Sequence, residues 1–317
     1  MPLSKIQLKS ASRNLIINGD FRIWQRGTSH TSTATNEYSA DRFRTEGNSL
    51  STTISRQAFT AGQTDVPNFP TYYTRVATSA KPSSGQYWGL MQRIEAPLNA
   101  RQGQTYTLSY WVRSTSGTVA ASAFTYGFGG SGSARSNSPA LTTTWQKVTN
   151  TQANINVSGG GAYLSVYIMH VPDTAPSSMS VEIANVKVEE GHVATDFEHR
   201  SIGEELLLCK RYFTNLVGGS DAFSFPGKGQ GSTTVDGIFP LAVPLRASPT
   251  MNSLAIRFFS DGGFTSTTTT PTANQFQANN DVLAINIGSF SGGASFANNE
   301  VGNWGPVAAT LTIDAEL

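Results

Sequence analysis

Aromatic side chains are the residues of this sequence best suited to hold a ligand. Trp111, Tyr163 and Tyr167 lie on strongly alternating segments, each opposite a mainly aliphatic row. Sugar rings present apolar C–H faces on which aromatic faces stack, while nearby polar groups bind the hydroxyls. Large aromatic residues also fill β-sandwich cores and subunit interfaces, so burial and an interface remain alternatives to glycan binding here. Three other aromatic residues are predicted to lie in the core: Trp24, Trp88 and Tyr110.

Patterns for catalysis or metal binding are missing or incomplete. The four histidines lack the HxH or HExxH spacing of a metal site. Glu189–Glu190 and Glu204–Glu205 are adjacent pairs, and neighbours in a strand point to opposite faces, so neither pair forms an acid–base dyad by itself. The glycines at 127, 129 and 132 have the spacing of a dinucleotide motif, but no helical pattern follows them. The sequence therefore predicts a protein that is not an enzyme and binds neither metal nor cofactor.

The bulk composition argues against several classes of partner. Charged residues make up 14% of the 317 residues and the net charge is +1, so no strong field favours nucleic acid. No apolar run approaches the roughly 20 residues that span a bilayer, and residues 1–12 lack the apolar core of a signal peptide. Cys209 is the only cysteine, which excludes an intramolecular disulfide and favours folding in a reducing cytosol. We expect synthesis in a cytoplasm, with no membrane insertion and no nucleic-acid binding.

Period-two alternation of apolar residues predicts strands through most of the chain up to residue 188. In 105–112 and 162–169 apolar residues recur at every second position, which packs one face of each strand inward. Turn-rich clusters separate the segments, and Asn18–Gly19 predicts a further turn. The predicted strands are Leu50–Phe59, Tyr72–Thr78, Gln86–Glu95, Thr105–Arg113, Val119–Phe128, Trp145–Gln152, Ala162–Met169 and Met179–Val188. Antiparallel strands in this number and spacing predict a β-sandwich of jelly-roll type.

A second, smaller β-sandwich is predicted in the C-terminal part of the chain. Its clearest strands are Val235–Leu241, Ser253–Phe259, Val282–Ile287 and Pro306–Ile313. The fold class is therefore all-β, with one short connecting α-helix. The predicted organisation is an arm at residues 1–12, a jelly roll at 13–197, a helical connector at 198–213 and a β domain at 214–317.

One stretch, Glu198–Phe213, has the pattern of a helix. Ser201 precedes Glu204 by three residues, the spacing of a capping box, in which each side chain binds the backbone N–H of the other residue. Acidic residues occupy the first turn and basic residues the last, as the helix dipole favours. Leu207, Tyr212 and their apolar neighbours leave little polar surface, so we expect protein to cover this helix on most sides. We predict a rigid connector packed against both β domains.

Three stretches occur in the order found in a known group of proteins. They are NLIINGDFRIWQRGT at Asn14–Thr28, YSADRF at Tyr38–Phe43, and TDFEHRSIGEELLLCKRYF ending at Phe213, which follows VEIANVKVEEG. Together they resemble bacteriophage tail-fibre and virion-surface proteins, in which the third stretch links two β domains. The resemblance implies a protein on the virion surface that binds a host-cell glycan or receptor, as a tail fibre does. It also implies a homotrimer, since most virion fibres close a threefold interface.

The first domain also resembles carbohydrate-binding modules of families four and nine. NLIINGDF near its start, LNARQGQTYTLSYWVRSTSG and TTTWQKVT in the middle, and VEIANVKVEEG at its end carry this resemblance. Those modules often hold a structural calcium ion through carboxylates near the first and last strands. Here Arg22 follows NGDF, and Ala184–Asn185 stand where an Asp pair is common, which counts against calcium.

The N-terminal arm is the predicted attachment point to other virion proteins. Residues 1–12 have no obvious fold of their own, and four of them are suited to join a partner's sheet or groove: Lys5, Ile6, Leu8 and Lys9. An alternative function is therefore a capsid decoration or head-fibre protein anchored by this arm. A polysaccharide depolymerase is less favoured, because such an enzyme usually has a longer β-helical body and converging acids.

Overall fold

The computed structural model describes most of the N-terminal part of the chain and shorter segments after it. The described residues are 14–47, 51–96, 99–129, 135–157, 162–217, 225–229, 235–247, 250–251, 256–260, 263–266, 272–279, 282–288, 301–306 and 310–316. They form strands and one α-helix, which confirms the all-β prediction. They divide into two compact units at residues 205 and 206, within helix α1 (Ile202–Lys210). The predicted attachment residues lie outside the described residues: Lys5, Ile6, Leu8 and Lys9.

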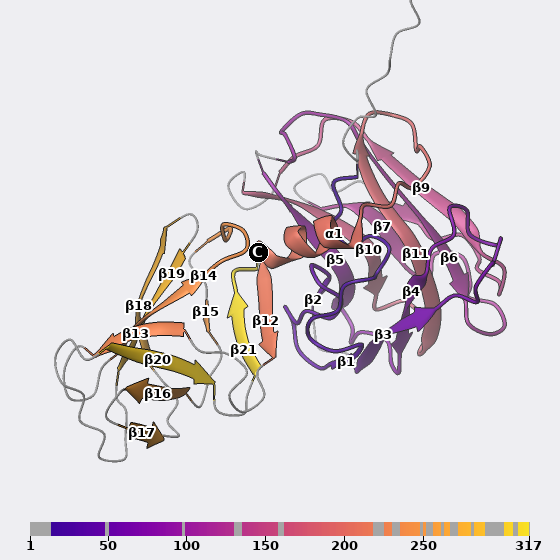
Figure 1. The fold of residues 1–317 in the computed structure, drawn as a ribbon. Coiled ribbons are helices and arrows are strands. Elements are labelled where there is room, and N and C mark those ends of the chain that lie inside the picture. Colours follow the sequence, from indigo (N-terminus) through magenta and orange to yellow (C-terminus); the bar gives the residue numbers. More distant parts are fainter. Residues whose placement is uncertain are drawn as a thin grey trace, which may run out of the picture. The chain divides into compact units, whose positions relative to one another are not determined.

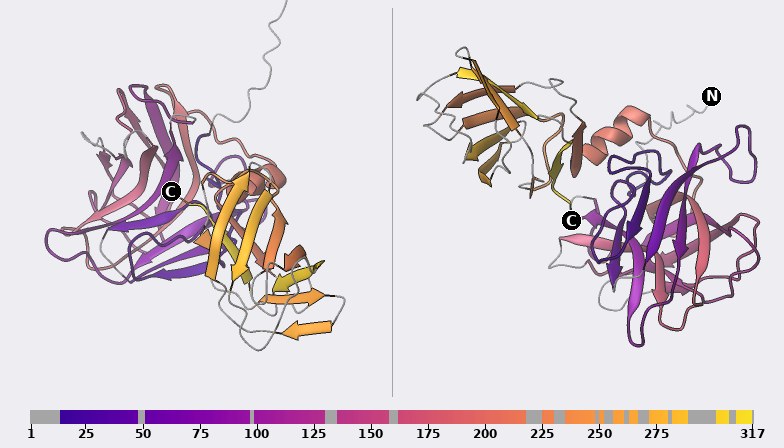
Figure 2. Two further views of the ribbon diagram at one scale, coloured as in Figure 1. Left: turned by 90° about the vertical axis from the view of Figure 1, so that its left-hand side faces the viewer. Right: turned by 90° about the horizontal axis from the view of Figure 1, so that it is seen from below.

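Unit 1, which ends at Glu205, is a sandwich of two antiparallel sheets (Figures 1 and 2). The six-stranded sheet has the order β1 (Ser29–Ser32), β3 (Thr52–Ala58), β4 (Tyr72–Thr78), β11 (Met179–Glu190), β6 (Tyr106–Ser114) and β9 (Gln146–Gln152). The five-stranded sheet has the order β2 (Arg44–Gly47), β5 (Tyr87–Glu95), β10 (Tyr163–Pro172), β7 (Thr125–Phe128) and β8 (Arg135–Asn137). The chain passes repeatedly from one sheet to the other, as in the predicted jelly roll.

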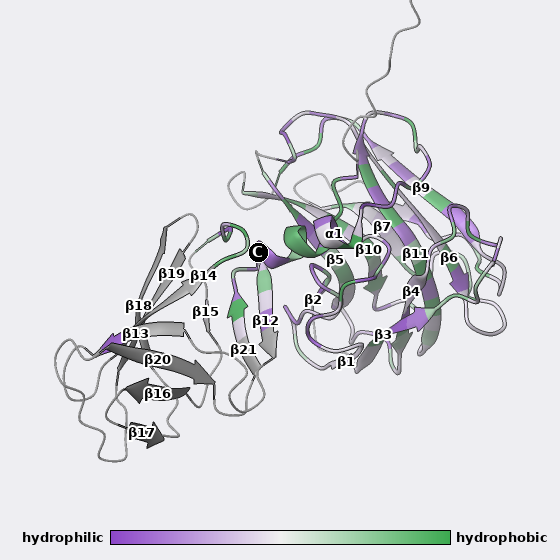
Figure 3. Cartoon of the chain, viewed as in Figure 1, coloured by the Kyte–Doolittle hydropathy of each residue, from purple (hydrophilic) through white to green (hydrophobic). Residues whose placement is uncertain are grey.

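Alternation along the strands builds the core between these sheets. β6 turns Tyr110 and its alternate neighbours inward, where they have no exposed surface. Figure 3 shows the corresponding change between hydrophobic and hydrophilic residues along β11. The Tyr110 hydroxyl donates a 2.8 Å hydrogen bond to the Ile168 carbonyl on the other sheet, so its polar tip is satisfied inside the core. Trp24 and Trp88 are also buried, which confirms the three predicted core aromatics.

Unit 1 differs from the predicted strand pattern at short elements. β1, β2 and β8 have 4, 4 and 3 residues, too few for alternation to be recognisable in the sequence. The predicted strand Val119–Phe128 is reduced to β7, because the chain turns at Ser122, where φ is 61°. Val119 forms only an isolated bridge with Leu141. The predicted turn at Asn18–Gly19 is confirmed by a 3.0 Å bond from the Phe21 N–H to the Asn18 carbonyl.

Unit 2, which begins at Leu206, contains two further antiparallel sheets. The three-stranded sheet has the order β12 (Phe213–Val217), β21 (Thr310–Asp314) and β15 (Thr250–Met251). The seven-stranded sheet has the order β17 (Gly263–Ser266), β16 (Ile256–Ser260), β20 (Val301–Pro306), β13 (Phe225–Gly229), β14 (Val235–Pro240), β19 (Val282–Gly288) and β18 (Thr272–Asn279). Three of the predicted strands correspond to β14, β16 and β19. The fourth falls on the end of β20 and on β21, with residues 307–309 outside the described residues.

Helix α1 has the predicted N-cap at Ser201, but it is shorter than the predicted stretch 198–213, because Phe213 already belongs to β12. The Glu204 N–H donates a 3.2 Å bond to the Ser201 hydroxyl, and acidic residues fill the first turn. Its surroundings differ from the prediction, because Leu207 is 44% exposed whereas Tyr212, just after the helix, is 2% exposed. Only one face of an amphipathic helix is packed against protein. Because the consecutive apolar residues 206–208 point in different directions around the helix axis, they cannot all lie on that face. Across the described residues, no helix is both long and apolar enough to cross a bilayer.

Candidate functional site

The structure separates the three aromatic residues predicted to bind sugar. Trp111 lies on the outer face of the six-stranded sheet, on β6, whereas Tyr163 and Tyr167 lie on the outer face of the five-stranded sheet, on β10. The two outer faces of a sandwich point in opposite directions, so these residues cannot form one binding surface. They belong to two separate surfaces: the arginine–tyrosine face, formed by Arg93, Arg135, Tyr163 and Tyr167, and the Trp111 pocket.

Arginine side chains cover the two tyrosine rings of the arginine–tyrosine face. The guanidinium carbon of Arg93 lies 4.1 Å from the centroid of the Tyr163 ring. That of Arg135 lies 4.9 Å from the centroid of the Tyr167 ring. Both distances are typical of cation–π contacts. The surface offered to a ligand therefore consists of guanidinium groups supported by tyrosines, rather than of bare aromatic rings.

Tyr167 forms the floor of this face. It is 9% exposed, and its hydroxyl donates a hydrogen bond to the carboxylate of Glu46. A Cβ atom added at Gly89 or Gly129 would lie 3.1 or 2.7 Å from the Tyr167 ring, so these glycines make room for the ring across the sheet. Burial and the Glu46 carboxylate raise the pKa of Tyr167, which keeps the hydroxyl protonated. With so little exposed surface, Tyr167 supports the surface more than it contacts a ligand.

The charges on this face are unequally paired. Glu46 lies 3.6 Å from Arg93, but Arg135 has no carboxylate partner among the described residues, and its Nη1 atom is buried without an acceptor. Residues 130–134, which precede Arg135 in the sequence, read GSGSA and contain no acidic residue. Burial and the Arg135 charge lower the pKa of His170 to about 4, so this histidine is neutral at pH 7. Arg135 therefore presents a positive charge without a counter-ion in the described structure.

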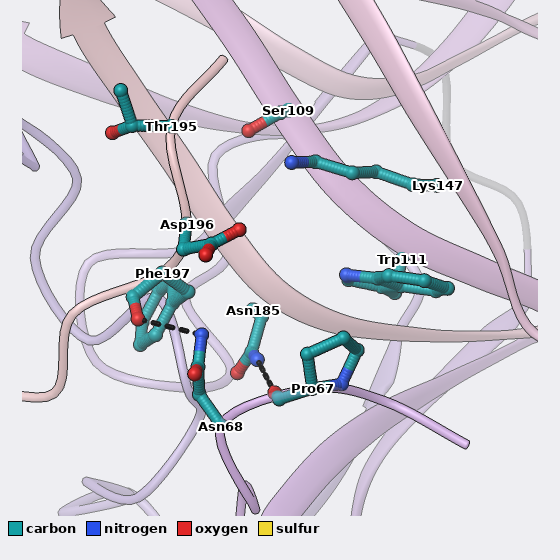
Figure 4. Close-up of a pocket in the computed structure, with 9 residues that line it drawn as sticks. All are labelled: Pro67, Asn68, Ser109, Trp111, Lys147, Asn185, Thr195, Asp196 and Phe197. Atoms are coloured by element: carbon teal, nitrogen blue, oxygen red, sulfur yellow. Dashed lines mark hydrogen bonds between the residues drawn. The ribbon is translucent and has the colours of Figure 1, made fainter. Parts of the chain in front are cut away.

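The Trp111 pocket is a cavity of about 110 Å³ on the opposite side of the sandwich. Strands β6, β9 and β11 supply its floor, and residues 67–68 and 195–197 supply its walls (Figure 4). Trp111 pairs with Lys147 and Ala184 on the two neighbouring strands, so the three side chains share one face. In Figure 4 the indole nitrogen and the Lys147 ammonium point into the space that faces the Asp196 carboxylate. Donors and an acceptor thus converge around the edge of an aromatic ring.

A β-bulge directs Asn185 into this pocket. Ala184 pairs with Trp111 and Lys187 with Ser109, so two residues of β11 stand opposite one residue of β6. Asn185 has a φ of 52°, a left-handed conformation that asparagine tolerates better than most residues. Bulges of this kind re-aim side chains beside functional sites. The Asn185 amide nitrogen donates a 3.2 Å bond to the Pro67 carbonyl on the pocket wall.

The NGDF motif holds the bulge in place. The Val186 N–H donates a 2.8 Å bond to the Gly19 carbonyl, and the Asn14 side chain donates a 3.0 Å bond to the Val186 carbonyl. A Cβ atom at Gly19 would lie 2.1 Å from the Val186 oxygen, so only glycine allows this approach. The sequence motif is therefore a support for the pocket rather than a part of its lining.

A buried ion pair positions the wall that carries Asp196. Lys187 and Glu189 are both almost fully buried, with 3.4 Å between the ammonium and the carboxylate. Lys187 donates bonds of 2.5 Å to the Thr195 hydroxyl and 2.7 Å to the Asp196 carbonyl. Glu189 accepts a 2.8 Å bond from the Thr195 N–H. These contacts fix the backbone beside Asp196.

His199 holds the other wall of the pocket in place. It bonds the Asn68 carbonyl at 2.8 Å and the Asp20 carboxylate at 2.9 Å, while the Asn68 side chain donates a 3.0 Å bond to the Phe197 carbonyl. Arg22 lies 2.6 Å from the same Asp20 oxygen. The Asp20 carboxylate is therefore already paired with the Arg22 guanidinium. Among the described residues, no three potential metal ligands are grouped closely enough to hold an ion.

The three stretches that carry the resemblance contact one another in unit 1. The Asn18 N–H donates a 2.5 Å bond to Glu205, and the Asn18 side chain donates a 3.1 Å bond to the Asp41 carbonyl. Glu205 also pairs with Arg200 at 3.1 Å. Burial raises the pKa of Glu205 and that of Asp41. One polar network thus joins the chain start, the YSADRF turn and the first turn of α1.

Several residues of the two surfaces are not apparent from the sequence. Arg93 and Arg135 follow no motif, and their position over tyrosines depends on strand register. The outward position of Lys147 could be predicted from the sequence, because Lys147 alternates with the buried Val148 on a strand next to that of Trp111. Asn185 occupies a position where the carbohydrate-binding modules commonly have aspartate, and the bulge that aims it is invisible in the pattern of β11.

Comparisons with known proteins give limited similarity. No family model and no curated protein matches the chain. The enzymatically active domain of bacteriophage CBA120 tailspike protein 4 is 14% identical, with 56% of this chain and 22% of that chain covered and a TM-score of 0.33. The xylan-binding domain CBM22-1 of Paenibacillus barcinonensis Xyn10C is 12% identical over 58% of this chain and 98% of that chain, with a TM-score of 0.32.

A cyclase from Fischerella sp. TAU is 12% identical over 58% of this chain and 100% of that chain, with a TM-score of 0.38. This chain spans about a fifth of the tailspike structure. Similarity at this level does not place the chain in a family.

Proposed function

We propose that this chain is a virion surface protein whose first unit binds an acidic glycan on the host cell through the arginine–tyrosine face. The observation that carries the proposal is Arg135, which is stacked on Tyr167 and has no carboxylate partner among the described residues. A ligand that brings a carboxylate would supply the missing counter-ion. Arg93, stacked on Tyr163 nearby on the same sheet, offers a second guanidinium.

Stacking makes these arginines suitable for recognition. A guanidinium that lies over an aromatic ring can still direct N–H donors at its edge toward a ligand, and a carboxylate can bind two of them in a bidentate manner. The rings restrict the side chains before the ligand arrives, so less conformational entropy is lost on binding. The neutral, half-buried His170 adds no competing charge at pH 7.

We propose binding without catalysis on this face. Glu46 accepts the Tyr167 hydroxyl and lies 3.6 Å from Arg93, so it is engaged in holding the floor and one arginine. A carboxylate committed in this way is poorly placed to exchange protons with a sugar.

The virion role rests on the three sequence stretches described above and on the composition of the chain. Within this proposal the arm at residues 1–12 attaches the protein to other virion proteins, and the chain forms a homotrimer. Three copies of a weak site raise the avidity for a repetitive glycan without any new contact. Sedimentation of the full chain at micromolar concentration should give a trimer mass. A monomer mass would contradict the trimer.

Removal of the arm tests the attachment. Deleting residues 1–12 should leave the thermal unfolding of the chain unchanged and abolish its incorporation into particles. Normal incorporation of the truncated chain would contradict attachment by the arm. Electron microscopy of particles labelled against this protein would distinguish a tail location from a capsid location.

The glycan site is tested by charge-matched ligands and variants. Calorimetric titration of the full chain with a polyuronate and with a neutral glucan of equal length should show binding of the polyuronate only. Arg135→Gln should weaken that binding by about tenfold, the usual effect of one charge-assisted bond of roughly 1.4 kcal/mol. Arg101→Gln is the control, because Arg101 is 61% exposed and is already paired with Glu190 on β11, a strand of the other sheet. Equal affinity for both glycans, or unchanged binding by the Arg135 variant, would contradict the proposal.

A further inference from the structure

We propose that the Trp111 pocket is a second sugar site, which binds the acetamido group of an N-acetylated sugar. The inference extends the proposed glycan-binding function, but it uses the outer face of the other sheet and none of the residues of the arginine–tyrosine face. The pocket is separately built, with its own supports at the Asn185 bulge, the Lys187–Glu189 pair and the Asn68–His199 contact.

An acetamido group has three requirements, and the pocket meets each of them. Its carbonyl needs donors, which the Trp111 indole N–H and the Lys147 ammonium provide on one side (Figure 4). Its N–H needs an acceptor, which the Asp196 carboxylate provides on the facing side. Its methyl group needs an apolar contact, which Pro67 and Phe197 provide on the wall. The polar groups thus match the two ends of an amide dipole.

Asn185 provides an independent indication of a ligand. It is 3% exposed, and its amide nitrogen is used by the Pro67 carbonyl. Its side-chain oxygen accepts no hydrogen bond from the described residues. Buried acceptors without donors are uncommon in native proteins and call for an explanation. A ligand N–H or O–H that enters beside Asn185 would supply the donor.

The charges of the pocket favour a neutral, dipolar group. Lys147 and Asp196 contribute one charge of each sign to the lining. A free carboxylate would approach Asp196 as well as Lys147, and a free ammonium would approach Lys147 as well as Asp196. Each ion would therefore meet a like charge, whereas an amide places its negative end toward Lys147 and its positive end toward Asp196. This separates the pocket from the arginine–tyrosine face, which lacks a counter-ion for Arg135.

The size of the pocket favours a terminal substituent. Its volume of about 110 Å³ is smaller than the roughly 150 Å³ of a cavity that holds one benzene molecule. A sugar ring would remain at the mouth, and its acetamido substituent would fill the interior. A peptide amide has a chain on both sides, whereas an acetamido group ends in a methyl group. A sugar substituent therefore fits a pocket of this size better than a protein backbone does.

The proposal is tested by fluorine NMR on the full chain labelled with 5-fluorotryptophan. The chain has five tryptophans, and Trp111→Phe identifies the Trp111 signal. N-acetylglucosamine should shift that signal with a dissociation constant of about millimolar order, because a single acetamido group makes few contacts. Glucosamine and glucose, which lack the acetyl group, should bind at least about tenfold more weakly. No shift with N-acetylglucosamine, or an equal response to glucose, would overturn the proposal.

Additional ligands and variants test whether the amide must belong to a sugar and whether the two sites bind independently. N-methylacetamide, an amide without a sugar, should bind more weakly than N-acetylglucosamine, and equal binding would overturn the assignment to a sugar. Asp196→Asn and Lys147→Met should each weaken the N-acetylglucosamine response by about tenfold in a folded chain. Arg135→Gln should leave it unchanged. If one of the two ligands, polyuronate or N-acetylglucosamine, does not bind while the other binds as expected, only the proposal for the site of the missing ligand is overturned.

Discussion

Gly19 is the residue whose replacement tests the construction of the Trp111 pocket most directly. In Gly19→Ala the new Cβ atom would lie 2.1 Å from the Val186 oxygen, whereas ordinary contacts begin at 3.4 Å. The two backbones must therefore separate by roughly 1 Å. That movement would break the bond from the Val186 N–H to the Gly19 carbonyl and weaken the bond from Asn14 to the Val186 carbonyl.

The expected cost follows from these contacts. Two hydrogen bonds contribute about 1 kcal/mol each, and overpacking in a well-ordered region adds about 1–3 kcal/mol. The free energy of unfolding of unit 1 should fall by about 3–5 kcal/mol, and the midpoint temperature by roughly 10 °C for a unit of this size. Tryptophan fluorescence measures the transition, because four of the five tryptophans belong to unit 1. Below the transition, the fluorine signal of Trp111 should also move, since the bulge lies beside it.

Gly203→Ala is the matched control. Gly203 lies in α1, and a Cβ atom there would meet nothing within 4 Å. Alanine is the better helix former, so this variant should be unchanged or more stable by up to about 1 kcal/mol. A Gly19→Ala midpoint within about 2 °C of the parent chain would refute the reasoning, because it would mean that the close approach to Val186 is not part of the folded structure.

Three further predictions concern other side chains of unit 1. Tyr167→Ala should lower the free energy of unfolding by about 3 kcal/mol, because the ring is 9% exposed, and the half-buried Tyr163→Ala by only about 1 kcal/mol; equal costs in urea unfolding would contradict this difference. Lys187→Met should cost about 3–5 kcal/mol by leaving Glu189 buried without its cation, and adding Glu189→Leu should restore part of the loss; a simple sum of the two costs in urea unfolding would contradict the pairing. Burial lowers the pKa of His170 from 6.5 to about 4, so its contribution to stability is complete above pH 6.5 and is lost as the pH falls to about 4. Between these pH values the His170→Gln chain should lose about 1–2 kcal/mol less stability than the parent chain, after allowance for the partial exposure of His170. Equal losses in both chains would contradict the assignment.

Strand alternation made the sandwich and its core predictable. Tyr110 alternates with other apolar residues, and every second residue of an antiparallel strand must face the same way, so its burial follows from the sequence. The same rule places Trp111 and Tyr163 on outer faces. It does not say which outer face, because that depends on which sheet each strand joins, and the order of strands in a jelly roll is set by contacts between distant segments.

The chemical character of the two surfaces was not predictable in the same way. Alternation places Tyr167 on an outer face, yet Gly89 on β5 and Gly129, just after β7, make room for its ring, which is buried. Whether an outward ring is bare or covered depends on the next strands in the sheet, here the one that brings Arg135. Local periodicity contains no information about that neighbour.

The polar network around Asn18 explains why three separate stretches of sequence carry the resemblance. Asn18 joins Asp41 to Glu205, and the adjacent Gly19 holds the bulge that aims Asn185. Changing any of these residues would leave a buried polar group without a partner or a backbone without room, which costs stability whatever the ligand. Arg135 and Lys147, by contrast, lie outside the three stretches and are free of these constraints. Proteins that share the stretches should therefore share this polar network and the bulge, while differing at glycan-binding positions such as Arg135 and Lys147.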